Sequence, residues 1–427
     1  MDYIDSFYSR TLHDTTPRAA LDGRVEADCL IVGAGLAGLS CALELARRGL
    51  RPAVFEAGCI GFGASGRNGG IVSPAFACDG DAIEARVGRS AARDLHRMTI
   101  EGVAILRDNI RSLGLTEAVA TPGLLNLRRF DHSADLHAHA QAYARDYGYE
   151  FTYLDRAAIR DRLQTTRYVH GLADGAAFHI HPLNYLRGLA REIERLGGRI
   201  FEQTEVSKVQ TKGAEKRLFS AGGQARAPHI IFATGGYTGG LMPVLRRAVL
   251  PISTYMMVSE PAPELIATAI RTPEAVLDDR RASDYYRVVD GGKRLLWGGR
   301  ITTKAASAAG IAAELRAEME HVYPQLAPLR TEVSWSGQMA YARHLMPQIG
   351  KLAPGAWHVT AFGGHGLNTT ALAGRVVAEA ICGETNRIAA FAPFPLVWAG
   401  GAVGLAVAQA TYWKLQLQDW WRERAAA

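Results

Sequence analysis

Residues 28–70 read DCLIVGAGLAGLSCALELARRGLRPAVFEAGCIGFGASGRNGG, and this stretch joins two apolar runs through a glycine-rich turn. The first run, at 29–32, leads into the pattern G-x-G-x-x-G, and a helical pattern follows as far as Gly49. A second apolar run, at 53–55, ends at the acidic residue Glu56. This order of strand, glycine turn, helix, strand and acid is typical of a βαβ unit that binds a dinucleotide.

The glycine turn predicts where the phosphates of the dinucleotide would lie. Gly33 allows the tight turn, Gly35 lets the backbone approach the pyrophosphate, and Gly38 lets the helix pack closely on the strand. The carboxylate of Glu56 is placed to accept hydrogen bonds from the adenosine ribose. The predicted binding residues of this unit are Gly33, Ala34, Gly35, Leu36, Ala37, Gly38, Glu56 and Ala57.

Residues 61–70, GFGASGRNGG, form a second loop that contains five glycines. A loop with so few side chains lets backbone amides lie along an extended ligand, with Ser65 and Arg67 available for phosphate or ring oxygens. The alternative interpretation is a flexible surface loop. The binding interpretation adds Gly63, Ala64, Ser65, Arg67, Asn68, Gly69 and Gly70 to the predicted site.

These motifs resemble the FAD-dependent amine and amino-acid oxidoreductases of the D-amino-acid oxidase type, which include glycine and sarcosine oxidases. Within that family the sequence is most similar to the gamma-glutamylputrescine oxidase group. The resemblance extends over roughly residues 25–385. It is carried by ASGRNGG at 64–70, ATGGY at 233–237, PISTYMMVSEP at 251–261, LLWGGR at 295–300 and FGGHGLN at 362–368.

The resemblance implies an α/β (α+β two-domain) flavoprotein, with a Rossmann-like FAD-binding domain interleaved with a substrate domain built on an antiparallel sheet. The expected ranges are 24–77, 155–249 and 330–385 for FAD, 78–154 and 250–329 for substrate, and 386–427 for a C-terminal helical tail. The resemblance also places at the cofactor Val206, beside the adenine, and Ala233, Thr234, Gly235, Gly363, Gly364, His365, Gly366, Leu367 and Asn368.

The resemblance implies that the FAD is bound without a covalent link. Sarcosine-oxidase-like relatives attach flavin through a cysteine in the segment that resembles residues 335–350, and this sequence has no cysteine there.

Periodicity and turn residues predict elements outside these motifs. Helices are expected at 89–113, 134–147 and 182–196, and a buried parallel strand is expected at 229–233. The runs 285–289 and 294–298 flank DGGK, which predicts a hairpin within an antiparallel sheet. A helix capped near Asn368 or Thr369 and ended by Gly383 is expected to direct its positive end at the flavin.

The chemistry that the resemblance implies is oxidation of a C–N bond by hydride transfer to flavin N5, followed by imine hydrolysis and reoxidation by O2. Such a reaction needs positioning groups rather than a side-chain nucleophile. Only the neutral amine can react, and a dry aromatic pocket favours that form. The candidates are Tyr255, Tyr285 and Tyr286 as walls or hydroxyl donors, Arg287 or Arg343 as a carboxylate clamp, and His344 and His365. A structural role is the alternative for each.

Other functions stay open on the sequence. One is oxidation of a cyclic or N-methyl amino acid, such as pipecolate, sarcosine or a D-amino acid, with a quinone or a protein as electron acceptor. A flavin monooxygenase is more remote, because the motif at 362–368 lacks the Gly-Asp pair of aromatic hydroxylases. A non-catalytic flavoprotein, which would use FAD only to complete its fold, is also a remote alternative.

Composition excludes several partners. The net charge of +6 comes without a basic run interleaved with aromatics, so we expect no nucleic acid. The five cysteines have no metal-like spacing, and their odd number argues against a disulfide framework. No secretion signal precedes the first strand, which predicts a cytoplasmic protein. The apolar segment 395–407 is too short to span a bilayer, and it is expected to pack on the protein, with an active-site lip or a shallow membrane contact as alternatives.

Overall fold

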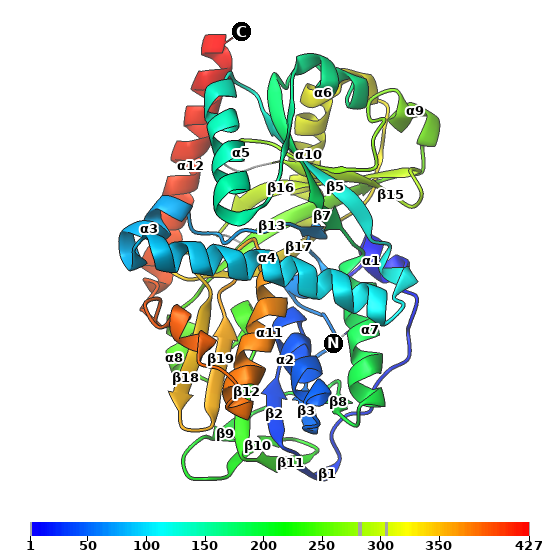
Figure 1. Ribbon diagram of the computed structural model, residues 1–427. Helices are drawn as coiled ribbons and strands as arrows, with labels where there is room; N and C mark the ends of the chain where they lie inside the picture. The colour runs from blue at the N-terminus through cyan, green and yellow to red at the C-terminus, as the bar shows by residue number, and fades with distance from the viewer. Residues whose placement is uncertain (1, 281–283, 304–305, 427) are drawn as a thin grey trace.

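The computed structural model describes residues 2–280, 284–303 and 306–426, and its two lobes are built on separate sheets (Figure 1). The lower lobe in Figure 1 holds a six-stranded sheet. Its strands, in spatial order, are β18 (Gln348–Ala353), β19 (Ala356–Thr360), β12 (His229–Phe232), β2 (Cys29–Val32), β3 (Pro52–Phe55) and β8 (Arg199–Phe201). Neighbouring strands from β19 to β8 are parallel, and β18 is antiparallel to β19.

The six-stranded sheet is covered on both faces, which explains its nearly continuous apolar strands. Along β2, Cys29 and Ile31 belong to a core shared with helices, whereas Leu30 and Val32 pack into a core shared with a small sheet. The helices on the first face are α2 (Leu36–Arg47), α7 (Pro182–Arg195), α11 (Gly366–Cys382) and, beyond α11, α4 (Arg89–Ser112). The small sheet on the second face contains β1 (Gly23–Glu26), β11 (Gly223–Ala227), β10 (Lys216–Ser220) and β9 (Lys208–Gln210).

The upper lobe contains a nine-stranded sheet that is mostly antiparallel. Its strands, in spatial order, are β17 (Thr331–Tyr341), β13 (Leu250–Ser259), β16 (Arg294–Thr302), β15 (Tyr285–Val289), β14 (Ala275–Leu277), β5 (Thr121–Arg128), β7 (His170–His179) and β4 (Ile71–Val72), with β6 (Thr152–Leu154) also paired to β7. Side chains alternate between its faces: Met256 and Val258 join the core of the lower lobe, whereas Tyr255 and Met257 join a second core. That second core includes Leu315 and Met319 of α10 (Ala308–Val322).

The remaining helices lie around these layers. The described chain adds α1 (Phe7–Arg10), α3 (Gly80–Val87), α5 (Ser133–Tyr147), α6 (Arg156–Arg162), α8 (Pro243–Arg247), α9 (Pro263–Ala267) and α12 (Gly401–Ala426). In Figure 1, α12 runs along one side of the molecule, with the C-terminus beyond the upper lobe. None of the described helices is long and apolar enough to cross a membrane.

Several sequence-based expectations are confirmed at the level of elements. Helices α4, α5 and α7 and the parallel strand β12 lie where periodicity predicts them. The hairpin of β15 and β16 pairs Val289 with Arg294, and Asp290 and Gly291 adopt positive φ in the turn between them.

One expected helix start needs correction, and the structure suggests different bounds for the two domains. The helix expected to begin near Asn368 or Thr369 begins at Gly366, although Gly383 ends it as expected. Strands β4, β7 and β17 fall within the ranges expected for the FAD domain, yet they pair in the nine-stranded sheet. We therefore propose that these three strands belong to the substrate domain, because backbone pairing joins them to it.

Candidate active site

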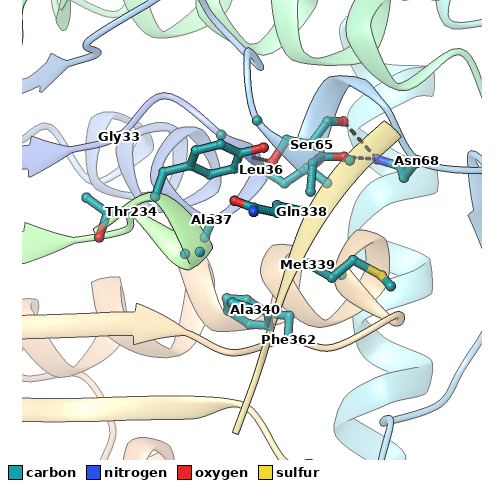
Figure 2. Close-up of a pocket in the computed structure, with 18 of the residues that line it drawn as sticks. Gly33, Leu36, Ala37, Ser65, Asn68, Thr234, Gln338, Met339, Ala340 and Phe362 are labelled. Carbon is teal, nitrogen blue, oxygen red and sulfur yellow. Dashed lines mark hydrogen bonds between the residues drawn. The ribbon is translucent and has the colours of Figure 1, made fainter. Parts of the chain in front are cut away.

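A cavity of about 1240 Å³ extends from the glycine turn of residues 33–38 to the nine-stranded sheet. Figure 2 shows residues that line it from α2 (Leu36, Ala37), from the loop at 61–70 (Ser65, Asn68) and from β17 (Gln338, Met339). Ligand pockets commonly enclose about 300–1,000 Å³. This cavity therefore has room for a dinucleotide together with a small second molecule.

The N-terminus of α2 lies at the cavity and has no side-chain cap of its own, because its N-cap residue is Gly35. The Leu36 N–H donates to Ser65 Oγ at 3.0 Å, so a hydroxyl of the second loop covers the helix end. Free N–H groups and the helix dipole make such an end a site for anions. Gly38 is needed for packing: a Cβ there would lie 1.9 Å from the Gly33 carbonyl oxygen.

Glu56 connects the glycine turn to the strand that follows it. Its carboxylate accepts the Ala34 N–H at 2.8 Å and the Gly58 N–H at 2.9 Å. Burial raises the pKa of the carboxyl above its usual value, and the backbone donors oppose that shift. Glu56 also lines the cavity, with oxygen lone pairs remaining for a ribose hydroxyl.

The loop at 61–70 is held in shape by its own side chains and by the nine-stranded sheet. Asn68 Nδ2 donates to the carbonyls of Ala64 and Ser65 at 3.2 and 2.8 Å, and Asn68 Oδ1 accepts the Gly70 N–H at 2.9 Å. Arg287 Nε donates to the Gly69 carbonyl at 2.9 Å. The loop is therefore an ordered wall of the cavity, which argues against the flexible-loop interpretation.

Arg67 is a partly buried cation on this wall. Its guanidinium lies 4.7 Å from the ring centroid of Phe62, and Nη1 donates to the Ser336 carbonyl at 3.3 Å. Burial lowers its pKa. Among the described residues, no carboxylate forms an ion pair with Arg67, so an anionic ligand group would compensate its charge.

The N-terminus of α11 forms another part of the wall. Its N-cap is His365, whose side chain makes no capping hydrogen bond, and Gly363 before it adopts a φ of +59°. His365 lines the cavity, and burial lowers its pKa below the usual value. The chain thus presents two helix N-termini without a side-chain cap on their N-cap residue, α2 and α11, to one cavity.

Most predicted cofactor residues line this cavity, and three do not. Ala34, Gly38 and Asn368 lie behind the lining. Asn368 is buried and directs Nδ2 to the carbonyls of Ala75 and Thr99 at 3.5 and 3.4 Å. The lining includes Gly33, Gly35, Leu36, Ala37, Glu56, Ala57, Gly63, Ala64, Ser65, Arg67, Asn68, Gly69, Gly70, Val206, Ala233, Thr234, Gly235, Gly363, Gly364, His365, Gly366 and Leu367.

Two predicted tyrosines lie on the wrong face of the sheet. Tyr285 lines the cavity, and burial raises its pKa. Its neighbour Tyr286 stacks on Trp297 with ring centroids 4.2 Å apart and bonds Tyr323 Oη at 2.7 Å. Tyr255 likewise lies in the second core and bonds Thr302 Oγ1 at 2.8 Å. Successive strand residues point to opposite faces, so Tyr255 and Tyr286 cannot line the cavity.

Neither of the two predicted arginine clamps lines the cavity, for different reasons. Arg343 is exposed and does not line the cavity. Arg287 is buried, and four of its five N–H groups are engaged: besides Gly69 it donates to Tyr8 Oη at 3.0 Å, to the Ile180 carbonyl at 2.8 Å and to His179 Nδ1 at 2.8 Å. We therefore propose that Arg287 supports the loop at 61–70 rather than contacting the substrate.

His344 is also outside the site. Its ring bonds the Pro395 carbonyl at 3.1 Å and accepts the Met346 N–H at 3.2 Å, so it fixes a turn beside the C-terminal segment. It does not line the cavity.

Sequence reasoning missed much of the wall on the substrate side. Successive strand residues face opposite sides, so Thr254 faces the cavity while its neighbour Tyr255 does not. Tyr341 ends the strand that also carries Gln338, and burial raises the pKa of Tyr341 to about 12. Arg300 sits at a bulge, because Ile301 pairs with Thr254 and Gly299 with Tyr255, and its φ is +57°. The missed residues of this wall are Thr254, Leu277, Arg300, Ile301, Gln338, Met339, Tyr341 and Leu345.

The residues present fit FAD. The N-terminus of α2 offers N–H groups to a pyrophosphate, the N-terminus of α11 offers a second positive helix end to the flavin, and Glu56 offers oxygens to a ribose. The loop glycines are needed for the shape of the wall, since a Cβ at Gly69 would lie 2.7 Å from the ring of Tyr285, and one at Gly363 would lie 2.7 Å from Ala77 Cβ. Within the described chain, no group of three or more His, Cys, Asp or Glu side chains could hold a metal ion. These features define a dinucleotide-binding flavoprotein.

The chain belongs to the family of FAD dependent oxidoreductases, whose model matches residues 28–380. It is 32% identical over 397 residues to the gamma-glutamylputrescine oxidoreductase of Escherichia coli, covering 92% of each chain. It is 25% identical over 402 residues to the glycine oxidase of Geobacillus kaustophilus, covering 88% of this chain and 98% of that one. The crystal structure of glycine oxidase from Geobacillus kaustophilus superimposes with a TM-score of 0.72 at 22% identity, over 87% of this chain and 99% of that chain. The protein is therefore an FAD-dependent enzyme.

Proposed function

We propose that this protein oxidises the C–N bond of a small amine, with a gamma-glutamylputrescine-like compound as the first candidate. The observation that carries the proposal is a cofactor cavity that continues into an aromatic end lined by Tyr285 and Tyr341. The 32% identity to a gamma-glutamylputrescine oxidoreductase over 92% of both chains supports the choice of substrate.

The charges of the cavity suit a neutral amine. The carboxylates that line the described cavity are Glu56 and Glu205, and both lie near Val206 rather than near the two tyrosines. At pH 7 only about one in 1,000 amine molecules with a pKa near 10 is neutral, a cost of about 4 kcal/mol. A dry pocket without a carboxylate lowers the pKa of a bound amine and so reduces that cost.

When bound, FAD supplies the two-electron acceptor for hydride from the carbon that carries the nitrogen. The chain's own residues would position the two molecules. Tyr285 and Thr254 form one wall, while His365 and the α11 N-terminus lie on the cofactor side. Since no cysteine lines the described cavity, we propose that the cofactor is held without a covalent bond.

We propose O2 as the electron acceptor, with a quinone or a redox protein as the alternative. In the described part of the chain, the arginine side chains that line the cavity are Arg67 and Arg300, and no lysine lines it. The guanidinium of Arg300 is paired with Glu314 and Glu318 at 3.3 and 3.2 Å. Comparing O2 uptake with reduction of a soluble quinone during turnover distinguishes the acceptors.

A second candidate is oxidation of an amino acid such as glycine, sarcosine, pipecolate or a D-amino acid. The observation that favours it is the likeness to glycine oxidase over 98% of that protein's length.

Anaerobic mixing of the purified protein with a panel of amines tests these functions. The panel contains gamma-glutamylputrescine, putrescine, glycine, sarcosine, pipecolate and D-alanine, and the readout is loss of the oxidised flavin absorbance. We expect gamma-glutamylputrescine to bleach the flavin fastest. Fastest bleaching by an amino acid supports the second candidate. Full absorbance with the whole panel, together with rapid bleaching by NADPH, contradicts both and points to a monooxygenase.

A further inference from the structure

The C-terminal helix α12 is attached to the protein by hydrogen bonds and an ion pair, besides the packing of half-buried side chains. Tyr412 Oη accepts the Ile301 N–H at 3.0 Å, and Gln409 Oε1 accepts the Thr303 N–H at 2.9 Å. One turn before the C-terminus, Glu423 pairs with Arg129 at 2.9 Å. The buried residues of the described helix are Gln409, Tyr412 and Asp419, and each carries a polar group, while the apolar residues Leu405, Ala408 and Leu415 are half-buried.

The opposite face of α12 is apolar as well, and it is exposed, whereas a typical surface helix turns a polar face to water. Val403 is 68% exposed and Trp421 is 62% exposed. At 3.6 residues per turn the exposed apolar residues fall within an arc of about 140°. This face, hereafter the α12 apolar face, comprises Val403, Val407, Trp413, Leu417, Trp420 and Trp421, and Trp398 is exposed just before the helix.

The exposed charges of α12 itself are positive. Lys414, Arg422 and Arg424 are exposed, and the Arg424 guanidinium lies 3.8 Å from the ring centroid of Trp420. The sequence of the helix contains two carboxylates, Asp419 and Glu423. The first is buried and the second is the partner of Arg129, so both lie on the attached side.

We propose that the α12 apolar face docks on the surface of an anionic phospholipid bilayer, with α12 lying in the plane of the interface. Tryptophan is enriched at membrane interfaces, and basic residues beside apolar ones are typical of helices that lie on anionic lipids. The three exposed cations complement lipid phosphates, whereas two copies of this face would bring like charges together. The side chains of the α12 apolar face are exposed in the protein and therefore free to enter the lipid.

Docking would bring the membrane close to the cavity. Ile301, whose N–H donates to Tyr412 of α12, also lines the cavity. The surface therefore adjoins the wall of the substrate side, although the docking itself does not depend on which substrate is oxidised.

Flotation of the FAD-loaded full-length protein with vesicles tests the proposal. One vesicle population contains equal parts phosphatidylglycerol and phosphatidylcholine, and the other contains phosphatidylcholine alone. We expect the protein to float with the anionic vesicles, to bind neutral ones far more weakly, and to be released by high salt. Recovery of all protein at the bottom of both gradients overturns the proposal.

Variants separate the α12 apolar face from the rest of the surface. Trp413→Ser/Trp420→Ser/Trp421→Ser should abolish flotation, and Lys414→Ser/Arg422→Ser should weaken it by about fivefold for each basic residue. Lys208→Ser/Lys212→Ser removes two exposed lysines at and after β9, at the opposite end of the molecule, and should leave binding unchanged (Figure 1). Each variant should keep its yellow flavin, which shows that the fold is intact.

The competing occupant is a second copy of the chain. Light scattering coupled to gel filtration should give a monomer-sized mass, or a mass that the tryptophan variant does not change. A dimer that the tryptophan variant converts to monomer overturns the proposal, as does equal flotation of the wild type and the tryptophan variant.

Discussion

Arg287 shows how a buried charge can support a site without touching its ligands. It donates to one carbonyl of the loop at 61–70 and, outside that loop, to a second carbonyl, one hydroxyl and one imidazole nitrogen. Because an arginine side chain only donates, His179 Nδ1 must accept, and the proton lies on Nε2, which donates to the Pro273 carbonyl at 2.8 Å. The loop conformation therefore depends on a network of neutral acceptors around a single cation.

Arg287→Met should destabilise the protein and release the cofactor. It leaves two buried carbonyls without donors, and we expect the free energy of unfolding to fall by about 3 kcal/mol or more. Urea unfolding and flavin content per chain measure the two effects. Arg343→Met, at an exposed position, should change neither. If the Arg287→Met protein were stable and carried a full complement of bound flavin, and only its KM were raised, Arg287 would again be a candidate clamp for a substrate carboxylate.

Arg67, unlike Arg287, lines the cavity, and no carboxylate among the described residues forms an ion pair with it. Arg67→Met should weaken FAD binding by at least about tenfold, since hydrogen bonds to charged groups contribute about 1.5–3 kcal/mol. Equilibrium binding to deflavinated protein measures this. Arg300→Met is the control, because the charge of Arg300 is already balanced by Glu314 and Glu318. Equal affinities of Arg67→Met and wild type would show that Arg67 meets no anionic group of the cofactor.

At the scale of elements, the first βαβ unit was predictable because its pattern is local. Strand, glycine turn, helix and acid follow each other within residues 28–56, and β2, α2 and β3 form as expected. The hairpin of β15 and β16 was predictable for the same reason. The face of each strand was less accessible: Tyr285 and Tyr286 are both aromatic, so composition cannot show which one faces the cavity. Only packing against Trp297 decides it.

Gly38→Ala tests the packing of α2 on its strand. The added Cβ would lie 1.9 Å from the Gly33 carbonyl oxygen, which is backbone and cannot rotate away. We expect a loss of about 3 kcal/mol of stability, at the upper end for overpacking, together with loss of FAD. Thermal unfolding and flavin content measure these changes. Gly80→Ala is the matched control, since a Cβ at Gly80 meets nothing within 4 Å. Retention of flavin by Gly38→Ala would contradict the close approach seen here.

The N-terminus of α7 should make the protein sensitive to acid. His181 caps this helix through Nδ1, which accepts the Asn184 N–H at 3.1 Å, so protonation there breaks the cap. Burial, with the nearby Arg287 charge, lowers the pKa of His181 to about 3, well below the ordinary 6.5. Between these values the unfolded chain binds more protons than the folded one. Stability is therefore full above about pH 6.5 and decreases on acidification towards pH 3.

His181→Asn should keep the cap and remove this part of the acid sensitivity. An asparagine oxygen can accept the Asn184 N–H and does not titrate. We expect the free energy of unfolding to fall less steeply between pH 7 and pH 5, by up to about 1.4 kcal/mol per pH unit relative to wild type. Urea unfolding at the two pH values provides the comparison. Identical slopes would show that His181 is not neutral in the folded protein.

At the scale of the whole molecule, the interleaving of the chain limited prediction. Strands β4, β7 and β17 are separated in sequence by long stretches, yet all pair in the nine-stranded sheet. Their partners are set by tertiary contacts that no local pattern records. For the same reason the sequence did not predict which residues line the substrate side of the cavity, because Thr254, Tyr341 and Arg300 come from different strands. Glycine motifs located the cofactor side because their function is carried by the backbone.

The central claim is that one cavity, bounded by the N-termini of α2 and α11, binds FAD. The most direct measurement is the cofactor content of the purified protein, by absorbance and by mass spectrometry of the released ligand, before and after incubation with excess FAD. We expect one non-covalent FAD per chain, released intact on denaturation and absent from Gly38→Ala. Protein that is colourless and stays colourless after incubation with FAD would contradict it.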